Sequence, residues 1–118
     1  MNIILQFILY LKDKPYHTDF RETKSMFLLR DLNKFKQYIT HEEFQKIESF
    51  IRTYFISLLN SSFGSINNFI KENSVSDTLQ ISLTKNFSFL DEDLLFLFSS
   101  VEFSTSDFYQ KLYEYLTN

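Results

Sequence analysis

Apolar residues recur at helical spacing along much of the chain, and the clearest case is residues 40–60, THEEFQKIESFIRTYFISLLN. Thr40 is followed three residues later by Glu43, which is the arrangement of a capping box, where each side chain bonds the other residue's backbone N–H. The apolar positions that follow are three or four residues apart, as on one face of an α-helix. The segment therefore predicts a helix capped by Thr40. Its apolar face comprises Phe44, Ile47, Phe50, Ile51, Tyr54, Phe55, Leu58 and Leu59.

Four further segments carry helical patterns. Residues 25–39 place their leucines on one face and their cations away from it, and the short join to Thr40 predicts that this helix and the next are neighbours. Residues 104–118 begin with Ser, Thr and Asp, which favour helix starts, and residues 66–71 predict a short helix. Residues 2–11 suit either a helix that ends before a proline or a buried strand, and the helix is favoured.

Residues 78–90, TLQISLTKNFSFL, follow a different pattern. Leu79, Ile81 and Leu83 alternate with polar residues, which is typical of a strand or hairpin with one face exposed. The expected fold is therefore mainly α. It is a compact single domain over residues 1–118, a bundle of four to six helices with a small β-hairpin near residues 78–90, and an α+β fold is the alternative.

The segment SFLDEDLLFLF, residues 88–98, joins three carboxylates to an apolar run. In a helix Asp91 would cap, Glu92 and Asp93 would meet the positive end of the helix dipole, and Phe96 would point away from the core. In a strand both faces would need cover. The segment is thus either fully buried or a helix that presents an aromatic anchor beside carboxylates. The core positions of the helix would be Leu94, Leu97, Phe98 and Val101.

Composition narrows the function classes. The chain has 118 residues, of which 44% are hydrophobic and 23% charged, so it can bury one core and wholesale disorder is not expected. It has no cysteine, which excludes a disulfide scaffold, a thiolate nucleophile and Cys-ligated zinc. The apolar run at the start is too short to span a bilayer and lacks the features of a signal peptide, so we expect a cytosolic protein.

Charge is unevenly distributed along the chain. The net charge is −3, but residues 1–59 contain nine Lys and Arg against seven Asp and Glu, whereas residues 60–118 contain three against eight. The C-terminal half is therefore acidic, which argues against a nucleic-acid surface there and suits a basic partner.

Residues for catalysis are few. His41 lacks the second histidine of an HExxH zinc motif, and His17 with Asp19 has no recognisable nucleophile beside it. The acidic run at Asp91 lacks the spacing and the glycine of an EF-hand, and Gly64, the single glycine, excludes phosphate-binding glycine motifs. We therefore expect no enzyme, no metal and no cofactor. An apolar ligand is compatible with so many phenylalanines, but no sequence feature separates it from ordinary packing.

Binding to a partner remains, and two classes compete. The favoured hypothesis is a small inhibitor that occludes a basic protein, such as an immunity protein that neutralises a bacterial nuclease toxin; a phage-encoded inhibitor of a host enzyme would look the same. The rival is a helical nucleic-acid regulator that uses Lys24, Arg30, Lys34, Lys36, Lys46 and Arg52, although the neighbouring Glu22, Asp31, Glu42, Glu43 and Glu48 favour a solvated mixed-charge surface. For the inhibitor, the expected partner-binding residues are Asp91, Glu92, Asp93, Phe96, Glu102, Phe103, Asp107, Tyr109, Tyr113 and Glu114.

Overall fold

The computed structural model describes residues 3–13 and 21–118, with side chains from residue 24 onward in the second range. Within these residues the regular structure is entirely α-helical. The mainly α prediction is confirmed, whereas the described part alone has more helices than the expected four to six. The helices are α1 (Ile3–Asp13), α2 (Arg21–Tyr38), α3 (His41–Phe63), α4 (Ile66–Glu72), α5 (Asp77–Thr84), α6 (Asp91–Ser100) and α7 (Thr105–Thr117).

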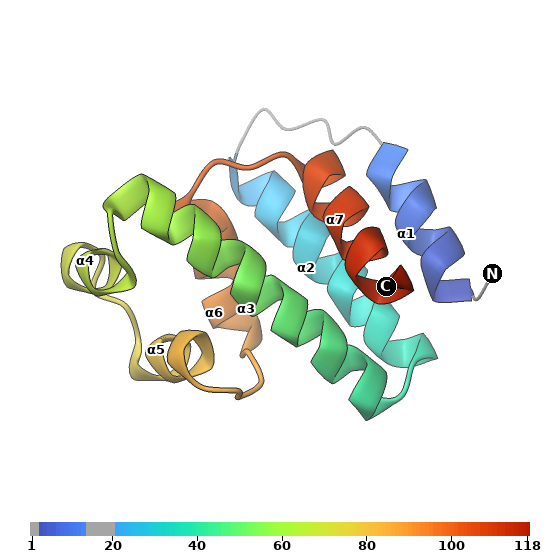
Figure 1. The fold of residues 1–118 in the computed structure, drawn as a ribbon, viewed down its shortest axis with the longest axis horizontal. Coiled ribbons are helices and arrows are strands. Elements are labelled where there is room, and N and C mark those ends of the chain that lie inside the picture. Colours follow the sequence, from blue (N-terminus) through green and yellow to red (C-terminus); the bar gives the residue numbers. More distant parts are fainter. Residues whose placement is uncertain (1–2, 14–20) are drawn as a thin grey trace.

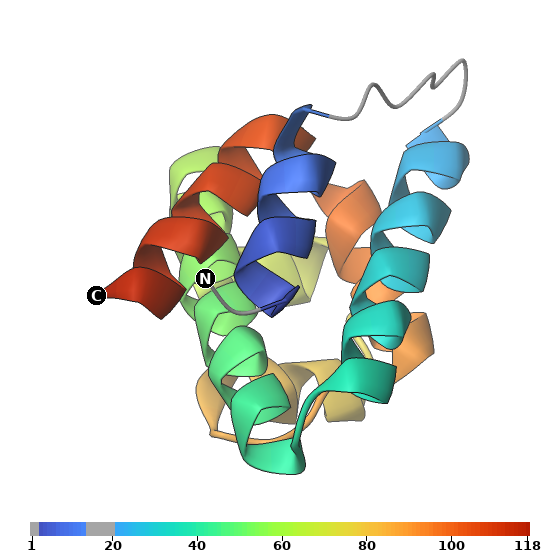
Figure 2. The ribbon, with the colours of Figure 1, turned by 90° about the vertical axis from the view of Figure 1, so that its right-hand side faces the viewer.

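The longest helix, α3, organises the fold. It packs against α2, α4, α5 and α7, and it forms an antiparallel hairpin with α2 (Figure 1). The helices at the two ends of the sequence, α1 and α7, lie side by side, whereas α4 and α5 lie at the opposite end of the molecule (Figures 1 and 2). Behind α3 in the view of Figure 1, α6 packs against α2.

Local side-chain caps explain where most helices begin. The Thr40 and Glu43 capping box is present as predicted: the backbone N–H of Glu43 donates to Thr40 Oγ1 (3.1 Å) and that of Thr40 to Glu43 Oε1 (2.9 Å). Ser65, Ser76 and Ser104 cap α4, α5 and α7 in the same way, each accepting a bond from the backbone N–H three residues later. These bonds satisfy amide groups that would otherwise lack partners at helix starts.

The hydrophobic core runs through every helix of the described residues and is rich in aromatic rings. The Phe55 ring lies at its centre, 5.4 Å from the ring of Phe98, 5.1 Å from that of Phe103 and 6.3 Å from that of Phe108, measured between centroids. Such edge-on and tilted ring pairs stabilise beyond their buried area by about 0.5–1.5 kcal/mol each. Most of the phenylalanines in the described residues therefore serve as core.

The β-hairpin predicted near residues 78–90 is wrong, and with it the α+β alternative for the described residues. Leu79 and Leu83 are buried on one face of α5, while Ile81, between them, is 41% exposed. Residues four apart, such as Leu79 and Leu83, lie on one face of a helix as well as on one face of a strand. The Ser76 cap favours the helix. Residues 2–11 are helical from Ile3 onward, as favoured.

Candidate partner-binding surface

The first turn of α6 gives its three carboxylates different roles. The predicted cap at Asp91 is wrong: the N-cap residue is Leu90, which makes no side-chain capping bond, and Asp91 is the first helical residue. Asp91 and Glu92 are exposed, whereas Asp93 is buried, with 5% of its surface accessible. All three carboxylates still lie at the positive end of the helix dipole, which favours them.

Asp93 is part of the interior and not of a partner surface. Its Oδ1 accepts a hydrogen bond from Ser76 Oγ (2.7 Å), and its Oδ2 accepts a short one from the Thr78 hydroxyl. Ser76 is also the cap of α5, so Asp93 joins the starts of α5 and α6. The expectation that Asp93 binds a partner is therefore corrected, because both of its carboxylate oxygens accept hydrogen bonds from within the protein.

The remaining exposed arc of α6 combines charge with an aromatic ring. Glu92 and Phe96 are one turn apart and both exposed, and Phe96 is 39% exposed, as the helical pattern predicted. Asp91 borders α2, where Asn33 Nδ2 donates to its Oδ2 over 3.5 Å. On the other side, the Phe96 ring lies 6.3 Å from that of Phe69 in α4. We call Asp91, Glu92, Leu95 and Phe96 the α6 face.

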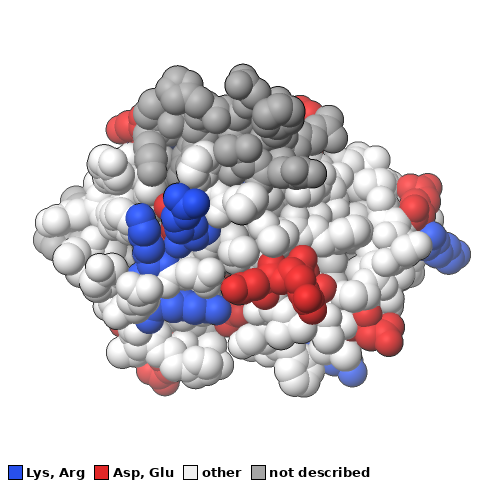
Figure 3. Space-filling model, turned by 180° about the vertical axis from the view of Figure 1, so that it is seen from behind, with Lys and Arg blue, Asp and Glu red and all other residues white. Residues whose placement is uncertain are grey.

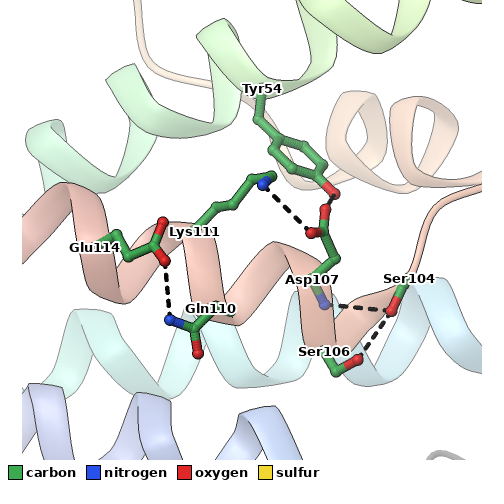
Figure 4. A network of polar contacts seen from close by, with 7 residues as sticks. All are labelled: Tyr54, Ser104, Ser106, Asp107, Gln110, Lys111 and Glu114. Carbon is green, nitrogen blue, oxygen red and sulfur yellow. Dashed lines mark hydrogen bonds and ion pairs between the residues drawn. The ribbon is translucent and has the colours of Figure 1, made fainter.

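A second acidic group lies on α7 and is partly neutralised (Figure 4). Asp107 accepts a hydrogen bond from the Tyr54 hydroxyl (2.8 Å) and forms an ion pair with Lys111 (3.5 Å), one turn later. Glu114 accepts from Gln110 Nε2 (3.0 Å). Burial and the neighbouring Asp107 carboxylate raise the pKa of Tyr54 well above its ordinary value.

These α7 side chains border an open groove of about 500 Å³ between α3 and α7. Its lining includes Phe50, Tyr54 and Tyr115 as well as Asp107 and Glu114. Tyr54 was missed as a surface residue because its spacing marks it only as part of the apolar face of α3. The groove thus offers aromatic surface with two carboxylates, and one of them, Asp107, already has a cationic neighbour in Lys111.

The other expected partner residues divide between surface and interior. Tyr109 is completely buried and donates its hydroxyl proton to Asp31 Oδ2 (2.9 Å), which corrects its assignment as an anchor. Phe103 and Tyr113 are partly buried against the core. Glu102 is exposed in the join between α6 and α7. The structure therefore does not bring the ten residues together: α6 presents one set beside α2 and α4, and α7 presents another beside α3.

The cations of the first half are likewise dispersed. The Lys24 ammonium donates to the backbone oxygen of Phe103 and lies 4.2 Å from the centroid of its ring. Burial lowers the pKa of Lys24, and the nearby Glu102 carboxylate opposes this effect. Arg52 donates to Asn86 Oδ1 (2.8 Å) and to the Phe87 carbonyl (2.6 Å), so it fastens the loop before α6. These two cations serve internal contacts.

Two carboxylates expected on a solvated surface are buried instead. Glu48 accepts hydrogen bonds from Ser88 Oγ (3.2 Å) and from the backbone N–H of Phe89 (2.9 Å), and Asp31 is bonded by Tyr109. The sequence held a signal for both, because each lies at i+3 or i+4 from apolar residues of its own helix.

The view from behind shows both signs of charge on one face (Figure 3). Lys and Arg side chains gather in one part of this face, and Asp and Glu side chains gather next to them. Arg30, Lys34 and Lys36 of α2 are exposed cations. The face is therefore divided by charge, in contrast to a uniformly acidic or basic one.

Two of the candidate catalytic residues, His17 and Asp19, lie outside the described residues. His41 is exposed at the start of α3, with Gln45 Nε2 3.3 Å from its Nε2. Among residues 3–13 and 21–118, no three His, Cys, Asp or Glu side chains gather as metal ligands would. In the same ranges, no helix has the length and apolarity needed to cross a membrane.

We compared the chain with known protein families, curated protein sequences and solved structures. No protein-family model, curated protein sequence or solved structure matches this chain.

Proposed function

We propose that this protein binds a basic protein partner and blocks it by occlusion, as an immunity protein does when it neutralises a bacterial nuclease toxin. One observation carries the proposal: on the α6 face two exposed carboxylates, Asp91 and Glu92, accompany a partly exposed Phe96. Neither carboxylate forms an ion pair with any described residue, whereas Asp107 on α7 has Lys111.

This combination suits recognition of a cationic cleft. Uncompensated carboxylates attract a basic partner over a distance and raise the association rate, and an aromatic ring at the contact supplies binding energy once water is removed. A nuclease that binds phosphate presents such a cationic cleft. A phage-encoded inhibitor of a host enzyme would use the same surface in the same way.

The first experiment is affinity capture from the native host with three forms of the tagged protein. The wild type is compared with Glu92→Lys and with Glu42→Lys. Both glutamates are exposed, and each is the second residue of its helix, so both reversals impose the same penalty on the helix dipole. Only the change on α6 alters the proposed face. We expect a basic protein to be retained by the wild type and Glu42→Lys and lost by Glu92→Lys.

Kinetics with the captured partner then test the mechanism. We expect Glu92→Lys to lower the association rate roughly 3- to 10-fold at low salt, and the difference to shrink as salt is added. Phe96→Ala is expected to raise the dissociation rate about 10-fold. In a nuclease assay the wild type should inhibit at a one-to-one ratio. Equal loss with Glu42→Lys, or unchanged rates for both α6 variants, would contradict occlusion through this face.

The runner-up is a nucleic-acid regulator, which the exposed cations Arg30, Lys34 and Lys36 on α2 favour. It predicts steeply salt-dependent binding to bulk DNA or RNA that falls when Lys34 and Lys36 are both changed to Glu. Figure 3 shows Asp and Glu side chains next to Lys and Arg side chains on one face, and carboxylates beside a cationic surface argue against this function because they repel phosphate. Binding of nucleic acid that persists at moderate salt would favour the function of a nucleic-acid regulator over that of a protein inhibitor.

A further inference from the structure

A pocket of about 350 Å³ lies between α1 and α2, on a different part of the molecule from the α6 face. The first two turns of α1 supply Ile3, Ile4 and Phe7, and the last turns of α2 supply Lys34, Phe35 and Tyr38. Figure 2 looks onto the side of the molecule where α1 and α2 face the viewer.

The walls of the pocket are apolar, and aromatic packing between α1 and α2 holds them in place. Phe7 and Phe35 meet edge to face across the two helices, with centroids 5.3 Å apart, and Phe35 is almost fully buried. At the mouth, Ile3 is 67% exposed and Tyr38 is 68% exposed. A helix that is apolar on nearly every side is expected to be covered, yet the main packing partner of α1 is α7 alone. Apolar surface therefore remains in water at this pocket.

One cation accompanies this apolar surface. Among the described residues that line the pocket, Lys34 alone is charged, and it forms no ion pair or hydrogen bond with any described residue. It is exposed on the last turns of α2, so its flexible chain can bring the ammonium to the mouth of the pocket. The described lining thus combines an apolar interior with the positive group of Lys34 at its edge.

We propose that this pocket binds a small monocarboxylate with an apolar body, of the size of a ten-carbon fatty acid. The apolar chain would displace water from Phe7, Phe35 and Tyr38, and the carboxylate would pair with Lys34. The volume supports this size, because about 350 Å³ at roughly 30 Å³ for each water-sized group holds about a dozen such groups. Pockets for small ligands begin at about 300 Å³, so the site is near the lower limit of that range.

The test is an NMR titration of the isotope-labelled protein with decanoate, and with decyltrimethylammonium, which has the same chain and the opposite charge. We expect decanoate to bind with a Kd on the order of 0.1–1 mM and to shift the amide signals of α1 and the last turns of α2. The cationic probe should bind at least about 5-fold more weakly, because it meets Lys34 with like charge.

Two lysines of α2 give a matched pair of variants. Lys34→Gln should weaken decanoate binding roughly 3- to 10-fold and abolish the preference over the cationic probe. Lys36, two residues later, is exposed but lies over the Phe44 ring and outside this pocket, so Lys36→Gln should leave Kd within about 2-fold. Tyr38→Ala should weaken both probes, since it removes an apolar wall.

Several results would overturn the proposal. These are no binding of either probe at millimolar concentration, signal shifts centred outside α1 and α2, equal binding of the two probes, or equal losses in the two lysine variants. Sedimentation of the free protein gives a further check. A dimer that decanoate dissociates would mean that a second copy, and not a small carboxylate, is the normal occupant of the pocket.

Discussion

Replacing Asp93 by alanine is expected to lower the free energy of unfolding by about 3 kcal/mol. The carboxylate is buried and accepts hydrogen bonds from two hydroxyl groups, those of Ser76 and Thr78. A hydrogen bond to a charged group contributes about 1.5–3 kcal/mol, and two that share one acceptor group add incompletely. Alanine would also leave the two hydroxyls without this partner and remove a carboxylate from the first turn of α6.

Urea denaturation monitored by circular dichroism measures this loss, and thermal unfolding should show a decrease in Tm of about 10 °C. Asp91→Ala is the matched control, because Asp91 lies in the same helical turn but is exposed. It should cost about 0.5 kcal/mol, the usual contribution of a surface carboxylate to the helix dipole. The difference between the two variants isolates the contribution of the Asp93 hydrogen bonds.

A double-mutant cycle between Asp93→Ala and Thr78→Val tests the assignment of the partner. We expect a coupling energy of about 1–2 kcal/mol, since each single variant removes the same bond. A loss below about 1 kcal/mol for Asp93→Ala, or additive effects in the cycle, would refute the reasoning, because the carboxylate would then have no specific role in joining α5 and α6.

Three further changes test other parts of the structure. Tyr54→Phe should cost about 1 kcal/mol in urea denaturation, because it removes the hydrogen bond to Asp107. The pKa of Tyr54 is raised in the folded state, so above about pH 10 the unfolded chain releases this proton first and the wild type should lose stability. The variant lacks the hydroxyl and should lose less stability over the same pH range. Gly64→Ala should cost about 1 kcal/mol in thermal unfolding, because Gly64 ends α3 at φ +84°, where a side chain is strained although the added Cβ would make only an ordinary contact, 3.6 Å from Asn68 Nδ2. Glu48→Ala should cost about 2–3 kcal/mol and speed hydrogen exchange at the Phe89 amide, which loses its acceptor; unchanged exchange there would contradict the contact.

Helices whose start is encoded within four residues could be predicted from the sequence. The side chains of Thr40 and Glu43 each bond the backbone N–H of the other residue and so specify the start of α3. The Ser104 side chain caps α7 by accepting a bond from the backbone N–H of Asp107. The hairpin near residues 78–90 failed because Leu79 and Leu83 satisfy both the strand and the helix period. The deciding signal was the Ser76 cap, which lies before the alternating stretch. Local chemistry at the ends of an element therefore decided more than the apolar period within it.

Buried carboxylates could be predicted only in part. Their position on an apolar helix face was visible, but their partners were not: Asp31 is bonded by Tyr109, 78 residues away, and Glu48 by the backbone of Phe89, 41 residues away. A charged group enters the interior only if such partners satisfy it, and here they come from another helix, α7, and from the loop before α6. Sequence reasoning that examines one segment at a time consequently assigns these residues to the surface.

The same physics separates the three carboxylates of α6 and thereby defines the candidate surface. Successive residues of a helix differ by about 100°, so the edge of the buried side can fall between Glu92 and Asp93. Leu94, Leu97 and Phe98 fix that side, and Asp93 is drawn into it, where Ser76 and Thr78 satisfy its oxygens. Glu92 and Phe96 then face outward together. Because Asp93 fastens α6 to α5, the buried carboxylate also holds the exposed one in place, so Asp93→Ala should weaken partner binding without touching the partner.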